Sequence, residues 1–302
     1  MTPAGGLVVY LSAEMIDAHV HVVPTHLPGT GSLGVVLRLP PDQTAEEIRQ
    51  EMQATRASVA LAMGAWSITP EDPLGVNRTL QIAEMVPGLL AIGVMDPLKS
   101  ADDVEFFARV EAVLQAKRVV ALKGYLGYLP CGPDHPTYHV YYDLAARYKV
   151  PVIFHTGDTY SPQARLKFAQ PLLVDEVAVD HPDTRFVIAH VGNPWTVDAA
   201  EVVYKNVNVW TDLSGLVVGD GSEFSSEEYR DGISDLSTRI RQAFRYAERP
   251  NRFVYGSDWP LIPMAPYEEF VRSLIPAEHH DAVFEDNART LFRLESNTNL
   301  GK

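Results

Sequence analysis

The stretch VVALKGYLGYLPCGPDHPTYHVYYDLAARYKVPVIF, residues 119–154, contains a complete strand–helix–strand unit. Val119–Leu122 and Val150–Phe154 are continuous apolar runs, which are typical of strands buried on both faces of a parallel sheet. Between them, Tyr141–Tyr148 has apolar residues at helical spacing. A strand, a helix and a second strand in this order predict a β–α–β unit, the building block of α/β folds.

The same alternation extends over the rest of the chain. Further strands are expected at Met15–Ala18, Ser58–Met63, Leu89–Val94, Phe186–Ala189, Val207–Thr211 and Phe253–Tyr255. Further helices are expected at Ala45–Ala54, Ala101–Gln115, Leu172–Val179, Ala199–Tyr204, Ile233–Tyr246, Tyr267–Leu274 and His280–Leu294. Thr44, followed three residues later by Glu47, is typical of a capping box that opens the first of these helices. The Gly-, Ser- and acid-rich stretch 215–230 is expected to be a loop that follows a strand.

Eight strand-plus-helix units in a chain of this length predict an α/β fold, a single-domain (β/α)8 TIM barrel. We place the barrel at residues 15–302 and an N-terminal extension at residues 1–14. The glycine-rich motif of dinucleotide-binding folds does not follow the first strand, and the phosphate-binding loop motif is absent from the sequence. Nucleotide-binding α/β folds therefore lack their main sequence support.

Composition excludes several classes of function. The 302 residues include 25 Lys and Arg against 39 Asp and Glu, a net charge of −14, which argues against a nucleic-acid partner. The single Cys rules out an intramolecular disulfide framework and a Cys-rich metal cluster, and it fits a reducing cytoplasm. The apolar run Leu7–Leu11 lacks a basic flank and is far shorter than the roughly 20 residues of a membrane span. We therefore expect a cytoplasmic protein without a membrane partner.

Metal-ligating residue types stand at the expected ends of several strands, which is where (β/α)8 barrels build their active sites. Those residues are His19, His21, Lys123, His155, His190 and Asp258. His19 and His21 lie two residues apart on a strand, so both side chains can face the same way and chelate one ion. Together with His155 and Asp258 they form a nitrogen-and-oxygen set, the pattern of a catalytic Zn²⁺ site that remains open to water.

Longer motifs around these residues resemble a known family. They are D-x-H-x-H at residues 17–21, VIFHTGD at 152–158, FVIAHVGNPW at 186–195, VYGSDWP at 254–260 and EDNARTLFRL at 285–294. Together they resemble the amidohydrolase superfamily, in particular its "amidohydrolase 2" branch, from Met15 to about Leu294. That branch is similar to metal-dependent hydrolases and to non-oxidative decarboxylases of the aminocarboxymuconate-semialdehyde and resorcylate type.

The resemblance implies roles for the strand-end residues. His19, His21, His155 and Asp258 would bind one divalent metal, most often Zn²⁺ with Mn²⁺ as a second option, and the metal would activate a water molecule. His190 would act as general acid and base, and Asp258 would combine ligation with proton shuttling. Lys123 has two interpretations. It is either carbamylated and bridges two metals, with His155 and His190 on the second ion, or unmodified and available to a substrate carboxylate; we favour one metal.

Aromatic and basic residues near the same strand ends predict a pocket for a small organic substrate. The expected substrate-binding residues are Lys123, Trp66, Tyr125, Tyr128, Arg165, Trp195 and Trp259, with Tyr160 and Lys167 as further candidates. His26, His135 and His139 are expected in loops on the catalytic side, and His181, His279 and His280 at structural or surface positions. Cys131 has no identifiable base beside it, so we do not expect a nucleophilic thiol.

Two reactions fit this set of residues. The first is hydrolysis of an amide, ester or lactone by a metal-activated water, and the alternative is non-oxidative decarboxylation of an aromatic or enoic acid. Asp17 favours hydrolysis, because aromatic decarboxylases of the resembled branch often carry Glu or Ala there. A catalytically silent barrel should have lost ligands, whereas every expected ligand position is filled. Homodimers are common in the resembled family, so a homodimer is an expectation.

Overall fold

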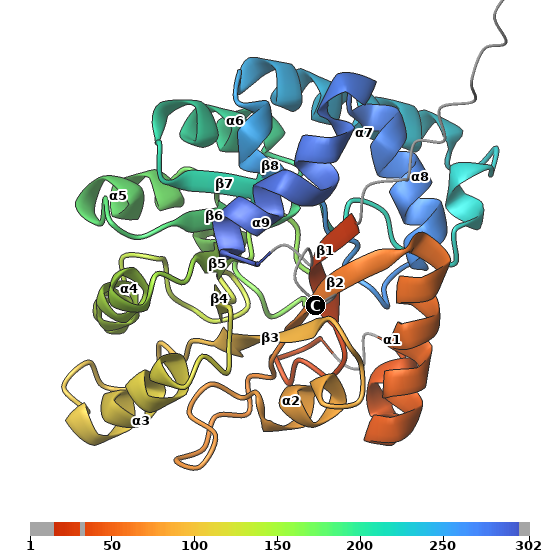
Figure 1. Ribbon diagram of the computed structural model, residues 1–302. Coiled ribbons are helices and arrows are strands. Elements are labelled where there is room, and N and C mark those ends of the chain that lie inside the picture. The colour runs from red at the N-terminus through yellow and green to blue at the C-terminus, as the bar shows by residue number, and fades with distance from the viewer. Residues whose placement is uncertain (1–14, 31–33, 296–302) are drawn as a thin grey trace, which may run out of the picture.

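A computed structural model describes residues 15–30 and 34–295, so the expected N-terminal extension lies outside the described residues. Eight strands form one sheet in the order β1 to β8, and every neighbouring pair along this order is parallel. Figure 1 shows the helices arranged around the ring of strands. The predicted (β/α)8 barrel is therefore confirmed.

The strands are short, and most of their residues are buried. They are β1 (Met15–His21), β2 (Ala57–Met63), β3 (Leu89–Val94), β4 (Ala121–Gly124), β5 (Val152–Phe154), β6 (Phe186–Ile188), β7 (Val209–Asp212) and β8 (Phe253–Val254). The described α-helices are α1 (Pro41–Thr55), α2 (Asn77–Ala83), α3 (Val104–Gln115), α4 (Pro136–Tyr148), α5 (Leu173–Asp180), α6 (Thr196–Lys205), α7 (Arg230–Tyr246), α8 (Met264–Leu274) and α9 (Asn287–Phe292). None of the described helices is long and apolar enough to cross a membrane.

The barrel closes where β1 meets the residues that follow β8. Ala18 N donates a hydrogen bond to Tyr255 O (3.0 Å), Asp258 N donates to His19 O (2.8 Å), and His21 N donates to Trp259 O (2.7 Å). We call these two segments, residues 18–21 and 255–259, the seam. Because β8 itself has only two residues, the backbone of the seam completes the ring next to the expected metal ligands.

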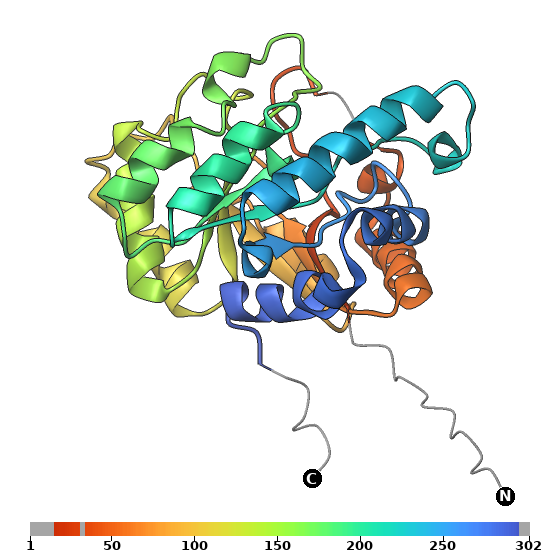
Figure 2. The same cartoon turned by 90° about the horizontal axis from the view of Figure 1, so that it is seen from above.

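Two apolar layers fill the structure. The inner layer lies within the barrel and includes Ile16, Leu61, Ile153 and Val254, and α9 adds Ala288, Leu291 and Phe292 to it. The outer layer packs between the strands and the surrounding helices. Figure 2 shows α9 lying across the end of the barrel at which β1 enters. That end is therefore covered, and the carboxyl ends of the strands face the opposite, open end.

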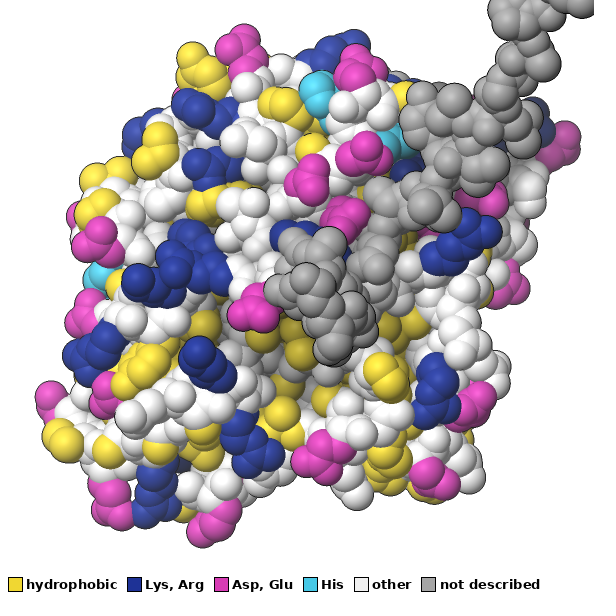
Figure 3. All heavy atoms as spheres, in the orientation of Figure 1, with side chains coloured by type: hydrophobic (Ala, Val, Ile, Leu, Met, Phe, Trp, Pro, Cys, Tyr) yellow, Lys and Arg dark blue, Asp and Glu magenta, His cyan; other side chains and the backbone are white. Residues whose placement is uncertain are grey.

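Figure 1 views the molecule from the side on which α9 lies. On the same face in Figure 3, acidic and basic side chains are interspersed. The acidic surplus of the chain is therefore mixed with basic groups on this face and not gathered into one acidic patch.

Four predictions of local structure were wrong or incomplete. Helix α2 was not predicted, because it has seven residues of which only Thr79 and Ile82 are buried, too few for a recognisable periodicity. The capping box was wrong: α1 begins at Pro41, since proline is favoured at a first helical position, and the Thr44 hydroxyl lies inside the helix and donates to Pro40 O.

The other two concern helix α4 and the last helix of the barrel. His139 was expected in a loop, but it lies in the first turn of α4. The helix expected at His280–Leu294 is divided into a π-helical turn, Ala282–Asp286, and α9, which ends before the left-handed residue Arg293. The stretch 215–230, in contrast, is the predicted loop, with a single 3₁₀ turn at Ser222–Phe224.

Candidate active site and metal centre

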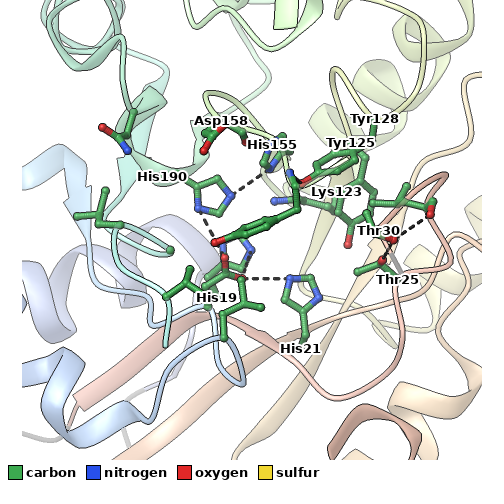
Figure 4. A pocket seen from close by; sticks show the side chains of 18 residues that line it. His19, His21, Thr25, Thr30, Lys123, Tyr125, Tyr128, His155, Asp158 and His190 are labelled. Atoms are coloured by element: carbon green, nitrogen blue, oxygen red, sulfur yellow. Dashed lines mark hydrogen bonds and ion pairs between the residues drawn. The ribbon is translucent and has the colours of Figure 1, made fainter. Parts of the chain in front are cut away.

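An irregularity in β1 turns the two histidines of the H-x-H motif into the barrel. Ile16 and Ala18 belong to the inner apolar layer, whereas Val20 belongs to the outer one, so the alternation of side chains changes phase between them. The pairing of β1 with β2 shifts between Asp17 and Val20, at the same place. His19 and His21 consequently share the inner face and line the cavity drawn in Figure 4.

Asp17 holds the seam together from behind this motif. Its Oδ1 accepts hydrogen bonds from His19 N (3.1 Å) and from Ser257 N (3.0 Å), so one carboxylate ties β1 to the segment after β8. Complete burial raises its pKa to about 7. The side chain is not among the described residues on the cavity wall. Asp17 therefore supports the fold of the seam. Because it does not line the described cavity wall, its contacts give no reason to prefer hydrolysis over decarboxylation.

Asp258 lies beside both histidines. Its Oδ1 is 3.2 Å from His21 Nε2 and 3.5 Å from His19 Nε2. The backbone of Asp258 has φ +66°, in the left-handed region that non-glycine residues rarely adopt. Burial raises the pKa of its carboxyl, but the nearby His19 and His21 rings outweigh this and hold the pKa below the ordinary value of 3.8. The carboxylate is therefore ionised at neutral pH.

Asp212, at the end of β7, fixes the tautomer of His19, and the sequence analysis missed it. Its Oδ2 accepts a hydrogen bond from His19 Nδ1 (3.0 Å), and its Oδ1 accepts from His190 N (2.8 Å) and Ser214 N (3.1 Å). Burial raises its pKa, but the adjacent His19 lowers it more, so the group is ionised. The strand-end criterion applied to Val207–Thr211 would have found this residue, which follows directly.

These contacts bring one potential ligand atom from each of three residues close together. The Nδ1 of His19 is engaged by Asp212, so its Nε2 lone pair faces Asp258 Oδ1. Burial lowers the pKa of His19 to about 4, which keeps the ring neutral. Asp258 Oδ1 and His21 Nδ1 are buried without a hydrogen-bond partner. Ligand atoms of His19, His21 and Asp258 all lie within 4.8 Å of one another, which suits a divalent cation with nitrogen and oxygen ligands.

His155 and His190 form a second pair on the other side of the cavity. His155 Nδ1 lies 3.1 Å from His190 Nε2. His155 Nε2 faces the carbonyl of Asp158 (2.8 Å) and His190 Nδ1 faces the carbonyl of Ser214 (3.1 Å), so these outer nitrogens carry the hydrogens. Burial lowers the pKa of both rings, so both are neutral and two lone pairs face each other. A shared proton or a bound cation satisfies this arrangement.

The cavity between these groups has a volume of about 160 Å³. Of the predicted substrate-binding residues, Lys123, Tyr125 and Tyr128 lie on its wall, as does Tyr160. Lys123 is two residues after Ala121 of the inner layer, so its side chain points into the barrel. Thr25, Thr30, Asn193 and an apolar set complete much of the wall, the apolar members being Leu27, Leu216, Val218 and Leu261.

Trp66, Arg165, Trp195 and Trp259 were also expected to bind substrate, but they are not among the described wall residues. Trp66 Nε1 donates instead to Asp96 Oδ1 (3.3 Å). Trp259 is buried in the seam, and Trp195 directly precedes α6. Arg165 precedes a 3₁₀ turn, and the ammonium of Lys167 lies over the ring of Phe168. The structure therefore brings together the metal-ligand types and the tyrosines, but not this second group.

His139 and His181 pair with each other on the outside of the barrel. His139 Nε2 faces Asp134 O (3.2 Å) and carries a hydrogen, so its Nδ1 accepts from His181 Nε2 at 2.7 Å. Both rings pack against the buried Tyr142. Burial and the neighbouring His139 lower the pKa of His181 below its ordinary value of 6.5. Cys131 is buried as well, and burial raises its pKa to about 11, so its thiol stays protonated.

Comparison with known proteins agrees with this geometry. The amidohydrolase-2 family model, described as amidohydrolase, matches residues 16–294, and the chain therefore belongs to this family. No curated protein matches the chain. The family is metal-dependent, and the His19–His21–Asp258 cluster is a site at which this chain could hold the metal.

Solved structures with the same fold include enzymes named for both reactions. One is named as a probable 2-pyrone-4,6-dicarboxylic acid hydrolase from Acinetobacter baumannii with citric acid bound (TM-score 0.63, 15% identity, 93% of this chain and 100% of that chain). Another is a 2,6-dihydroxybenzoate decarboxylase from Rhizobium (0.63, 14%, 94% and 100%). A third is a 5-carboxyvanillate decarboxylase from Novosphingobium aromaticivorans with bound manganese (0.63, 13%, 94% and 98%). At these identities the likeness establishes the fold alone.

Gly215 leaves the space in which Asp258 and His190 approach each other. It has φ +61°, and a Cβ there would lie 2.5 Å from Asp258 Oδ2 and 2.9 Å from His190 Nδ1. We expect Gly215→Ala to displace these groups and to weaken Zn²⁺ binding about 10- to 100-fold, as loss of supporting contacts to metal ligands does. A titration against a competing chelator measures this affinity. The control is Gly232→Ala, since no atom lies within 4 Å of the added Cβ; equal affinities for both variants would contradict the assignment.

The His139–His181 pair predicts a dependence of stability on pH. Because the pKa of His181 is lower in the folded protein than 6.5, the unfolded chain binds more protons below that pH. The stabilisation is fully present above pH 6.5 and is lost as the pH falls towards the lowered folded pKa. Urea unfolding between pH 5 and 7.5 should show this loss in addition to that from the buried His19, His155 and His190, and His181→Gln should reduce the slope without removing it. His279→Gln, whose ring contacts Phe244, should leave the pH dependence unchanged; an unchanged slope in His181→Gln would refute the prediction.

Proposed function

We propose that the protein is a metal-dependent hydrolase that cleaves an ester, lactone or amide bond in a small organic substrate. The observation that carries the proposal is the convergence of Asp258 Oδ1 with the Nε2 atoms of His19 and His21 on the cavity. We assign one Zn²⁺ per chain to these three residues, and Mn²⁺ is the second choice because a similar structure contains it. His155, the fourth ligand that the resemblance implies, remains a prediction.

The charges of the buried groups support a divalent cation. Asp212 and Asp258 are ionised, and Lys123 is the cationic side chain on the described part of the wall, so these groups together leave one negative charge in excess. A buried, uncompensated charge is costly, and a bound cation removes that cost. When bound, the ion would polarise a substrate carbonyl and make water a competent nucleophile at neutral pH.

Asp258 and His190 would carry out the proton transfers of the reaction. The ionised Asp258 carboxylate is placed to take a proton from the attacking water at Oδ2, which lies 3.9 Å from His190 Nδ1. The Ser214 carbonyl holds the hydrogen of His190 on Nδ1, so exchange with the substrate takes place at Nε2. The proton taken up by Asp258 has to return to the leaving group. We assign this return to Asp258 together with His190, whose unprotonated Nε2 would first accept a proton and then give it to the leaving group, so that both residues regain their starting states. Asp212 is a positioning residue, because it orients His19 and the backbone of His190.

A second candidate is non-oxidative decarboxylation of an aromatic or enoic carboxylic acid. Two observations favour it: similar structures are named as decarboxylases of hydroxylated benzoic acids, and Lys123 places a cation on the wall of the cavity. In this reaction His190 would deliver a proton to the carbon atom that loses CO₂. The His and Asp set is common to both reactions, so the chemistry of the substrate decides between them.

A substrate panel tests the proposal. Metal-depleted protein, reloaded with Zn²⁺ or Mn²⁺, would be assayed on lactones, esters, amides and hydroxybenzoates, with acid production and CO₂ release measured together. We expect metal-dependent acid production without CO₂, and one metal equivalent per chain. His21→Ala should lower the rate of turnover by at least about 100-fold, because removing a ligand costs more than removing a contact that supports one. His279→Ala is the control.

Each other outcome has a clear meaning. CO₂ release from a hydroxybenzoate in the absence of hydrolysis would select the decarboxylase. Two metal equivalents per chain, together with the mass of CO₂ added to Lys123, would show that the protein has a binuclear centre and not a single ion. Full turnover by His21→Ala on every substrate would reject both metal-dependent reactions.

A further inference from the structure

Two polar groups on the wall of the cavity have no hydrogen-bond partner. The Lys123 ammonium is fully buried, and its Nζ lies 5.4 Å from the centre of the Tyr125 ring. The Tyr125 hydroxyl is likewise buried and unpartnered. Leaving a charged donor and a neutral donor unsatisfied in the interior is unfavourable. Since both groups line the cavity, a ligand bound there can satisfy them.

Both groups are hydrogen-bond donors at neutral pH. Burial lowers the pKa of Lys123 to about 8, while Asp212 and Asp258 act in the opposite direction, and its amine can donate hydrogen bonds in either protonation state. Burial raises the pKa of Tyr125 above its ordinary value of 10, so the hydroxyl keeps its proton. An ammonium and a phenol that face one space match an acceptor group with negative charge and more than one oxygen atom, which a carboxylate provides.

The charge on the wall limits the ligand to one such group. The charged side chains of the described lining, apart from the neutral histidines, are Lys123, Asp158 and Asp258, and this lining contains no arginine. Asp158 is exposed and would repel a second carboxylate. With the proposed divalent cation in place and Asp17 in its protonated form, the buried Asp212, Asp258 and Lys123 leave one positive charge, which one carboxylate neutralises. A dianion would leave one negative charge uncompensated.

The volume of the cavity indicates the size of the ligand part that it can surround. Its volume of about 160 Å³ is close to that of an engineered apolar cavity of about 150 Å³ that binds benzene. Leu27, Leu216, Val218 and Leu261 supply apolar contacts for such a ring. Thr25 and Thr30 add hydroxyl groups to the wall. The space therefore suits one six-membered ring with one charged substituent.

The geometry points to a substrate with a single carboxylate on one ring, held by Lys123 Nζ and Tyr125 Oη. This inference deepens the proposed function and rests on it for the cation in the charge balance. It separates this protein from enzymes that take di- or tricarboxylates, because those need further cationic groups. The inference also requires that Lys123 is not carbamylated and that it binds the substrate.

Calorimetric titration of the metal-loaded protein tests the site with three probes: benzoate, neutral benzamide and the dianion isophthalate. We expect benzoate to bind most tightly. Lys123→Met, which keeps the length and removes the charge, should weaken benzoate binding about 10- to 100-fold, the loss expected for a hydrogen bond to a charged group. The same variant should weaken benzamide binding less than benzoate binding, because the amide oxygen accepts a hydrogen bond from the ammonium but gains no ion pair from it.

Matched variants keep the test independent of folding defects. Tyr125→Phe, which retains the ring, should weaken benzoate about 3- to 10-fold, as for one neutral hydrogen bond. Lys205→Met and Tyr246→Phe remove the same groups from surface pairs with Asp175 and Glu201, and both should bind benzoate like the wild type. Thermal unfolding of each variant identifies any that fail to fold; if Lys123→Met does, Tyr125→Phe decides.

Three results would overturn the inference: wild-type benzoate affinity in both Lys123→Met and Tyr125→Phe, tighter binding of isophthalate than of benzoate, or an intact mass that shows CO₂ on Lys123. Binding needs no turnover, so the two proposals fail separately. Lys123-dependent benzoate binding in a protein without hydrolysis would support the site and reject the hydrolase. Hydrolysis that His21→Ala abolishes, with benzoate binding independent of Lys123, would reject only the site.

Discussion

The backbone hydrogen bonds of the seam determine both the fold and the site. β8 is two residues long, so ordinary strand pairing cannot close the barrel on β1. Closure comes from Tyr255, Asp258 and Trp259, whose backbone atoms bond to residues 18–21. Asp17 reinforces this contact by accepting N–H groups from both sides of it. Because His19, His21 and Asp258 are themselves seam residues, closing the barrel also brings the three ligand side chains together.

Buried charge then gives the assembled site its chemistry. Asp212 accepts a hydrogen bond from His19 Nδ1, so His19 Nε2 is left as an acceptor beside the ionised Asp258. Two buried carboxylates against one ammonium leave an excess of negative charge at the site, and a bound cation would offset it. The left-handed backbone of Asp258 and His190 and the absence of a side chain at Gly215 allow this close approach. The metal centre and the carboxylate site at Lys123 are thus two parts of one charge balance.

Much of the fold and part of the site could be predicted from the sequence. Strands buried on both faces are continuous apolar runs, so all eight were found, and ligand-type residues at their ends were found with them. The sequence could not show which way a side chain points after a strand ends. Trp259 turns into the seam and Trp66 towards Asp96, although both stand close to strand ends. Asp212 was within reach of the same criterion, whereas the two facing lone pairs of His155 and His190 depend on contacts with distant carbonyls.

The central claim is that closure of the seam creates a site for one divalent ion between His19, His21 and Asp258. Anomalous X-ray diffraction from crystals grown with Zn²⁺, recorded on both sides of the zinc absorption edge, tests it most directly. We predict one strong anomalous peak per chain, within bonding distance of Nε2 of both histidines and of a carboxylate oxygen of Asp258. A peak bonded only by His155 and His190, or no peak within the barrel, would contradict the account.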